Sequence, residues 1–137
     1  MASEGLRMAE GFTFEVVGRV VGSARPRVTR HGTYIPAKTR RYRELIRSCF
    51  IEGGGQRMSG PLAVRVDVYR ELPRSRPKRV ESEPDTFKPD VDNVVKNVLD
   101  ALNGLAWDDD AGVVDLHVVK HPRTRARERI VVTIRRA

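Results

Sequence analysis

The sequence predicts a small single α/β (α+β) domain in which two main helices pack on one mixed β-sheet. Four segments alternate apolar and polar residues as strands do, and two segments carry an apolar stripe at helical spacing. These segments follow one another in the order β, α, β, α, β, β, which is typical of a sheet covered by helices. The 137 residues suffice for one hydrophobic core, and no repeat or linker divides them.

Residues 1–11 show no periodicity and are expected to be a flexible terminus, so the domain is placed at residues 12–137. The run FTFEVV from Phe12 predicts the first strand, which the two valines at 20–21 extend. The segment SARPRVTRHGTYIPAKT is expected to be a loop or an irregular hairpin that turns at His31-Gly32. In TRRYRELIRSCFIEGGG the apolar residues recur on one face, which predicts a helix that ends at the glycine run.

The second strand is predicted at Leu62–Tyr69, where the alternation is regular. Residues 71–89 contain four prolines and no periodicity, so we expect a flexible basic loop there. DNVVKNVLDALNG predicts the second helix, with Asn93, Lys96 and Asn97 on the face opposite its valines and leucines. GVVDLHVVK and RIVVTIRR predict the last two strands, joined by a basic turn.

Composition restricts the class of protein. A single cysteine excludes a disulfide framework, and no apolar run reaches 18 residues, so we expect a cytoplasmic protein that does not enter a membrane. The net charge of +8 favours an anionic partner, nucleic acid first. Nine acidic and only two basic residues lie between Glu83 and Asp115, a local charge of −7 that leaves +15 on the rest of the chain. An enzyme that grips phosphates and also holds a divalent cation needs both kinds of charge.

The acidic residues bracket the second helix. Asp90 and Asp92 precede it, and in an extended segment residues i and i+2 point the same way, so both carboxylates are expected to aim at one point. The Asp-Asp-Asp turn at 108–110 is placed to bring a further carboxylate back to them. Such a group suits Mg²⁺ or Mn²⁺, since no cysteine or histidine pair lies nearby to favour zinc. Two simpler interpretations remain open: an aspartate that only caps the helix, and a solvated turn.

The run KPDVDNVVKNVLDALNGLAWDDDAGVVDLHVVK resembles the signature of the RusA-like Holliday junction resolvase family of endonucleases, and ARPRVTRHGTYIPAKTRRYRELI is similar to its N-terminal segment. The resemblance covers roughly residues 12–135. It implies a small α/β homodimer that uses Mg²⁺ or Mn²⁺ to cut four-way DNA junctions by paired incisions. It assigns Asp90, Asp92 and Asp110 as catalytic and metal-binding carboxylates, Lys96 as the catalytic lysine, and Asp109 as a further metal ligand that is able to replace Asp110.

The basic remainder is expected to hold the DNA through its phosphates, because no base-reading motif is visible. The candidate DNA-binding residues are Arg25, Arg27, Arg30, Arg40, Arg41, Arg76 and Lys88. The function expected from the sequence is therefore a metal-dependent, structure-selective endonuclease that resolves four-way junctions in DNA recombination and repair. Two alternatives remain: a nuclease for other branched DNA, and a junction-binding protein without cleavage activity.

Overall fold

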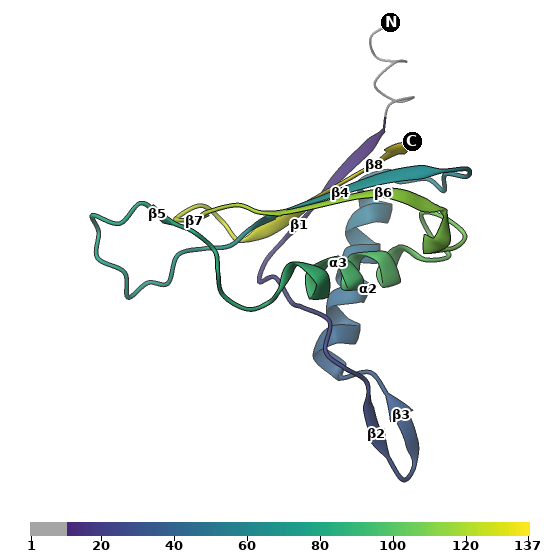
Figure 1. The fold of residues 1–137 in the computed structure, drawn as a ribbon, viewed down its shortest axis with the longest axis horizontal. Helices are drawn as coiled ribbons and strands as arrows, with labels where there is room; N and C mark the ends of the chain where they lie inside the picture. The colour runs from purple at the N-terminus through teal and green to yellow at the C-terminus, as the bar shows by residue number, and fades with distance from the viewer. Residues whose placement is uncertain (1–10) are drawn as a thin grey trace, which may run out of the picture.

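The structure, a computed structural model, describes residues 11–137, and the terminal segment expected to be flexible lies almost entirely outside this range. Its centre is a four-stranded mixed sheet in the order β1-β8-β4-β6 (Figure 1). The strands are β1 (Phe12–Val17), β4 (Leu62–Tyr69), β6 (Val113–Lys120) and β8 (Arg129–Arg136). Strand β8 pairs antiparallel with both β1 and β4, whereas β4 and β6 run parallel.

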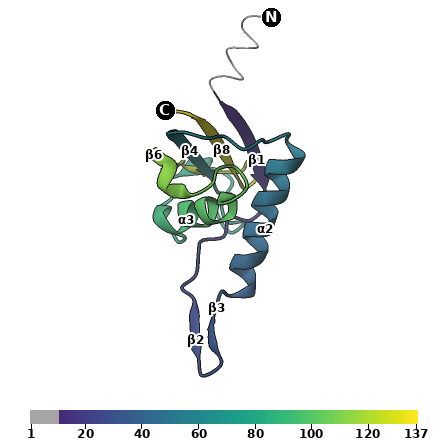
Figure 2. The same cartoon turned by 90° about the vertical axis from the view of Figure 1, so that its right-hand side faces the viewer.

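Two helices, α2 (Ala37–Glu52) and α3 (Val91–Leu102), lie on the same face of the sheet (Figure 2). Helix α3 lies on the crossover from β4 to β6, as a parallel strand pair requires. The core fills the space between the layers: Ile46 and Phe50 of α2 and Val94 and Val98 of α3 are buried against the apolar face of the sheet. Trp107 closes the end of this core, and its indole N–H donates to Asn103 Oδ1 at 2.7 Å. The predicted fold class is confirmed.

Two extensions project from this body (Figure 1). The hairpin of β2 (Arg27–Thr29) and β3 (Gly32–Tyr34) turns at Arg30 and His31, one residue earlier than the predicted His31-Gly32, and all six strand residues are exposed. The second extension contains residues 71–86 and the turn that follows β6, where β5 (Ser82–Glu83) pairs with β7 (Arg123–Thr124). Here the Arg125 guanidinium donates to the carbonyls of Pro77 and Val80, both at 3.0 Å, so the proline-rich segment has defined contacts.

One boundary differs from the prediction. Strand β1 ends at Val17, before the two valines at 20–21, because Gly18 takes a positive φ of 127° and turns the chain out of the sheet. The amide of Val20 then donates to the Glu128 carboxylate at 2.8 Å instead of to a strand. None of the helices in the described part of the chain is long and apolar enough to cross a membrane.

Candidate active site and nucleic-acid cleft

The Asp90 carboxylate stands at the start of α3 without acting as a cap. Asp90 occupies the N-cap position with extended backbone, but its side chain makes no capping hydrogen bond. It instead accepts from Lys88 Nζ at 3.0 Å, and about half of the aspartate side chain is exposed. The capping interpretation of Asp90 therefore does not explain its carboxylate, which remains accessible to a ligand.

Asp92 lies inside the first turn of α3, because the helix already begins at Val91. The expectation that Asp90 and Asp92 share one extended stretch is therefore wrong, because Asp90 is the extended N-cap residue and Asp92 is already helical. From Asp92 the helix continues with Lys96 and Asp100 at successive four-residue steps, so the three side chains form a row along one face. Lys96 is exposed and has no ion-pair partner among residues 11–137, whereas Asp100 pairs with Arg43 at 3.0 Å.

Asp109 and Asp110 lie at the other end of α3, where a short 3₁₀ turn (η1, Asp110–Gly112) leads into β6. Partial burial, a hydrogen bond to Asp109 and the charge of Asp109 raise the pKa of Asp110, while a hydrogen bond with Asn103 opposes the shift. Asp100 is close enough to add to the repulsion. Three carboxylates thus repel one another at the end of the row that begins with Asp92.

The four predicted metal ligands are not gathered at one point. Asp92 and Asp100 are separated by about 12 Å along the helix axis at 1.5 Å per residue, and Asp110 belongs to the Asp100 end. Within residues 11–137 no three or more His, Cys, Asp or Glu side chains converge as a metal site. Asp90 and Asp92 by themselves fit a Mg²⁺ ion, since this ion takes one or two carboxylates and completes its shell with water and phosphate oxygens.

A basic cleft of about 670 Å³ opens beside Asp90. One wall is formed by Lys88, Pro89 and Asn93, which flank Asp90 in the chain, and the other by the segment from Arg19 to Arg27 and the start of α2. Its lining contains six basic residues and no acidic one: Arg19, Arg25, Arg27, Lys38, Arg70 and Lys88. Such a cleft attracts a polyanion and brings it to the start of α3.

Buried polar contacts hold the arginine-bearing wall against both helices. The Ser23 amide donates to the Asn93 carbonyl at 2.9 Å, and Asn97, which has no exposed surface, donates to the Val21 carbonyl at 2.8 Å. Arg43 of α2 completes the arrangement by donating to Asn97 Oδ1 at 3.0 Å and to Ser23 Oγ at 3.1 Å. Residues 21–24 are therefore fixed to α2 and α3 immediately before Arg25.

The remaining predicted DNA-binding residues do not line this cleft. Arg30 and Arg41 are exposed on the hairpin turn and on α2, Arg40 donates to the Ile35 carbonyl at 3.3 Å, and Arg76 pairs with Glu83 at 3.0 Å. The sequence interpretation missed Arg19, Lys38 and Arg70. Two of these three were detectable, because residues 16–43 contain eight basic residues and no acidic one.

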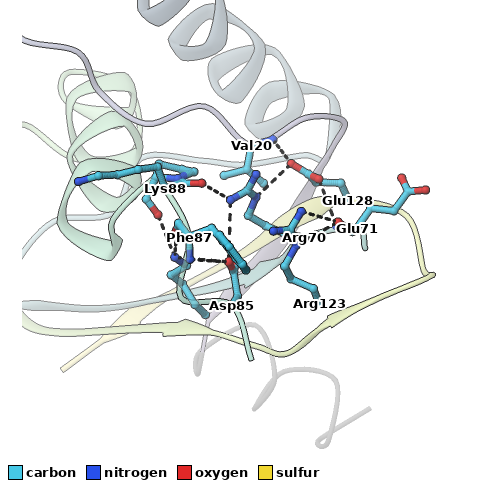
Figure 3. Close-up of polar contacts among 10 residues, drawn as sticks. Val20, Arg70, Glu71, Asp85, Phe87, Lys88, Arg123 and Glu128 are labelled. Atoms are coloured by element: carbon cyan, nitrogen blue, oxygen red, sulfur yellow. Dashed lines mark hydrogen bonds and ion pairs between the residues drawn. The ribbon is translucent and has the colours of Figure 1, made fainter. Parts of the chain in front are cut away.

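A buried ion network contacts the segment at residues 87–89, which leads to Asp90 (Figure 3). The Asp85 side chain has no exposed surface and lies 3.6 Å from Lys120 Nζ and 3.9 Å from Arg70 Nη1. Arg70 also approaches Glu128 at 3.5 Å, and the Glu128 carboxylate accepts from the amides of Val20 and Glu71. This network connects the ends of β4 and β6 to the wall of the basic cleft.

Two comparisons with known proteins show which family the chain belongs to. The profile of the Endodeoxyribonuclease RusA family matches residues 18–135 and so includes the cleft, the α3 row and the buried network. A protein of Bacillus subtilis (strain 168), described as the uncharacterized protein YqaN, is 35% identical over 132 residues, which cover 87% of this chain and 93% of the relative. The match spans nearly the whole domain, and the chain belongs to the RusA endodeoxyribonuclease family.

Proposed function

We propose that this protein is a metal-dependent endonuclease that resolves four-way DNA junctions by paired phosphodiester hydrolysis in recombination and repair. The observation that carries the proposal is the basic cleft, because residues on both sides of Asp90 form its wall. A DNA backbone held by Arg25 and Arg27 would then pass the start of α3. Membership of an endodeoxyribonuclease family supports hydrolysis as the reaction.

The chain's own residues would divide the work along α3. Asp90 and Asp92 would hold the divalent cation, Mg²⁺ or Mn²⁺, and water and phosphate oxygens would complete its shell, since Asp109 and Asp110 lie at the other end of α3. When bound, such a cation supplies an acidified water and a counter-charge for the phosphate. Lys96, which is exposed and has no ion-pair partner among residues 11–137, would lie against the scissile phosphate and stabilise the negative charge that develops there.

The proposal includes two further elements. Paired symmetric cuts require two equivalent sites, so we propose that the active form is a homodimer. We also propose that it acts in the cytoplasm. One observation favours a second candidate function, a junction-binding protein without cleavage activity: Asp109 and Asp110 group with Asp100 rather than with Asp90.

The test is cleavage of a synthetic four-way junction and of a linear duplex of the same sequence, each with Mg²⁺ or with EDTA. Wild type is compared with Asp92→Asn and with the control Asp115→Asn, a strand residue that pairs with His117 outside the site. We expect paired nicks in the junction alone, abolished by EDTA and by Asp92→Asn and retained by the control. Junction binding without cutting under Mg²⁺ and Mn²⁺ would refute the nuclease and support the binding protein.

A further inference from the structure

Three charged side chains are buried next to the segment that leads to Asp90, although the expected reaction assigns them no role. Lys120 and Arg70 are each 11% exposed, and Asp85, which lies between them, is fully covered. Taking charges out of water costs several kcal/mol per ion, and apolar residues of similar volume usually pack as well or better. The network therefore requires an explanation other than stability.

The two cations bind three successive backbone carbonyls (Figure 3). Lys120 Nζ donates to the carbonyls of Phe87, at 2.5 Å, and Pro89, at 3.0 Å. Arg70 Nη1 donates to the Lys88 carbonyl between them. Every carbonyl from residue 87 to residue 89 is thus held by a buried cation, and the next residue is Asp90.

The cations come from the ends of two paired strands of the central sheet. Lys120 is the last residue of β6, and Arg70 directly follows β4. The two strands pair in parallel up to Val68 and Lys120, so both side chains leave the sheet at the same end. The side chains of the segment they hold are largely exposed, with Phe87 at 45% and the Lys88 side chain at 84%, although the Arg123 guanidinium lies 5.0 Å from the Phe87 ring centroid. None of these three carbonyls accepts a hydrogen bond from any other donor among residues 11–137.

We propose that Lys120 and Arg70, with Asp85 as their shared counter-charge, are positioning residues for Asp90. They fix the backbone of residues 87–89 to the end of the sheet, and so set the position of the Asp90 carboxylate relative to Asp92 and to the basic cleft. This inference rests on the proposed function for its effect on cleavage, but the backbone restraint itself does not depend on any reaction. An error of about 1 Å in the position of a reacting group costs on the order of a hundredfold in rate.

The test compares Lys120→Met, which keeps the length of the side chain but removes its donors, with Arg125→Met. Arg125 is a matched control, because it also binds carbonyls of a loop and carries one positive charge, but the loop at residues 76–80 does not lead to Asp90. Three quantities are measured for each protein: amide hydrogen exchange by peptide, junction affinity without divalent metal, and the single-turnover cleavage rate with Mg²⁺. Lys120→Arg, which restores donors and charge, is the rescue variant.

For Lys120→Met we expect exchange to accelerate at least tenfold in peptides spanning residues 86–94. Junction affinity should stay within about threefold, and the single-turnover rate should fall tenfold to a hundredfold. Arg125→Met should loosen only residues 76–83 and cut at the wild-type rate, and Lys120→Arg should recover most of the loss. If Lys120→Met does not fold, Lys120→Gln, which keeps one donor group, takes its place with a smaller expected loss.

The outcomes separate this inference from the proposed function. If wild type does not cut but residues 86–94 loosen in Lys120→Met, the backbone restraint is supported and the nuclease assignment fails. If wild type cuts and Lys120→Met cuts equally fast, or keeps residues 86–94 protected, the positioning role is overturned. A fall in affinity equal to the fall in rate would also overturn it, because it would make Lys120 a DNA contact.

Discussion

Replacing Asn97 by alanine tests the link between the core and the DNA-binding wall. Asn97 has no exposed surface and makes two hydrogen bonds, one accepted from Arg43 Nε at 3.0 Å and one donated to the Val21 carbonyl at 2.8 Å. In Asn97→Ala both partners lose their bond in a place that water does not easily reach. We therefore expect the variant to unfold more readily and also to bind the junction more weakly.

The magnitude follows from the partners. A buried polar group left without its bond costs about 1–3 kcal/mol, and Arg43 keeps its contacts with Ser23 and Asp100. We expect a total loss of about 2–4 kcal/mol in the free energy of unfolding. For a domain of this size each kcal/mol lowers Tm by about 3–5 °C, so the expected shift is about 10 °C.

The assay is urea unfolding followed by far-UV circular dichroism, together with junction affinity measured without divalent metal. Ser48→Ala, a change on the exposed face of α2, is the control and should stay within about 0.5 kcal/mol of wild type. In Asn97→Ala, junction affinity should fall severalfold, because residues 21–24 lose their anchor and Arg25 must be ordered on binding. A loss below about 1 kcal/mol with unchanged affinity would refute the reasoning.

Three further outcomes are expected. Removing Arg25 and Arg27 together should reduce the slope of log affinity against log salt by about 1.8, and removing the equally charged pair Arg135 and Arg136, exposed at the end of β8, should change it less. Burial alone would raise the pKa of Asp67, but hydrogen bonds from Arg65 and His121 outweigh burial and hold it below its ordinary value. The ionised Asp67 carboxylate should therefore stabilise the fold above pH 3.8, and this contribution should disappear as pH falls through the lower folded pKa. Asp67→Asn should abolish this pH dependence of the free energy of unfolding, which is measured by urea titration. Because the pKa of Asp110 is raised, its ionisation opposes folding as pH rises, so Asp110→Asn should raise Tm at neutral pH without metal and lose this advantage below pH 3.8.

The main elements could be predicted because only one face of the sheet is covered by helices. Strands in such a sheet alternate apolar and polar residues along the sequence, and the predicted strands at 12, 62 and 129 begin at the observed residues, although Ala63 and Asp67 on the outer face of β4 are buried as well. The extension that carries β5 and β7 could not be predicted in the same way. It is held by Arg125 and by a two-residue strand pair, and neither leaves a periodic pattern in the sequence.

The site was predicted by residue type better than by geometry. Asn97 was placed on the polar face of its helix, because an amide counts as polar whatever it contacts, yet it is buried where Arg43 and Val21 satisfy it. The arrangement of the carboxylates depends on how the chain returns after α3. Spacing along the sequence does not determine that path, and the return places Asp110 beside Asp100 and Asn103.

The position of Asp90 and Asp92 at a helix N-terminus gives a further reason to expect a cation there. The free amides of a helix start normally attract phosphate, but here two carboxylates occupy that place at the edge of a cleft lined by basic residues. A phosphate drawn into the cleft meets their charges, and one such charge about 8 Å away costs about 0.5 kcal/mol in water.

Asp92→Asn should therefore bind the junction about twofold more tightly than wild type in EDTA. In Ca²⁺ it should bind more weakly than wild type, because only wild type keeps both carboxylates to hold a Ca²⁺ ion that bridges to the phosphate. The measurement is fluorescence anisotropy with a labelled junction, with Asp115→Asn as the equal-charge control. A variant that binds more tightly under both conditions would show that these carboxylates repel DNA without recruiting a metal.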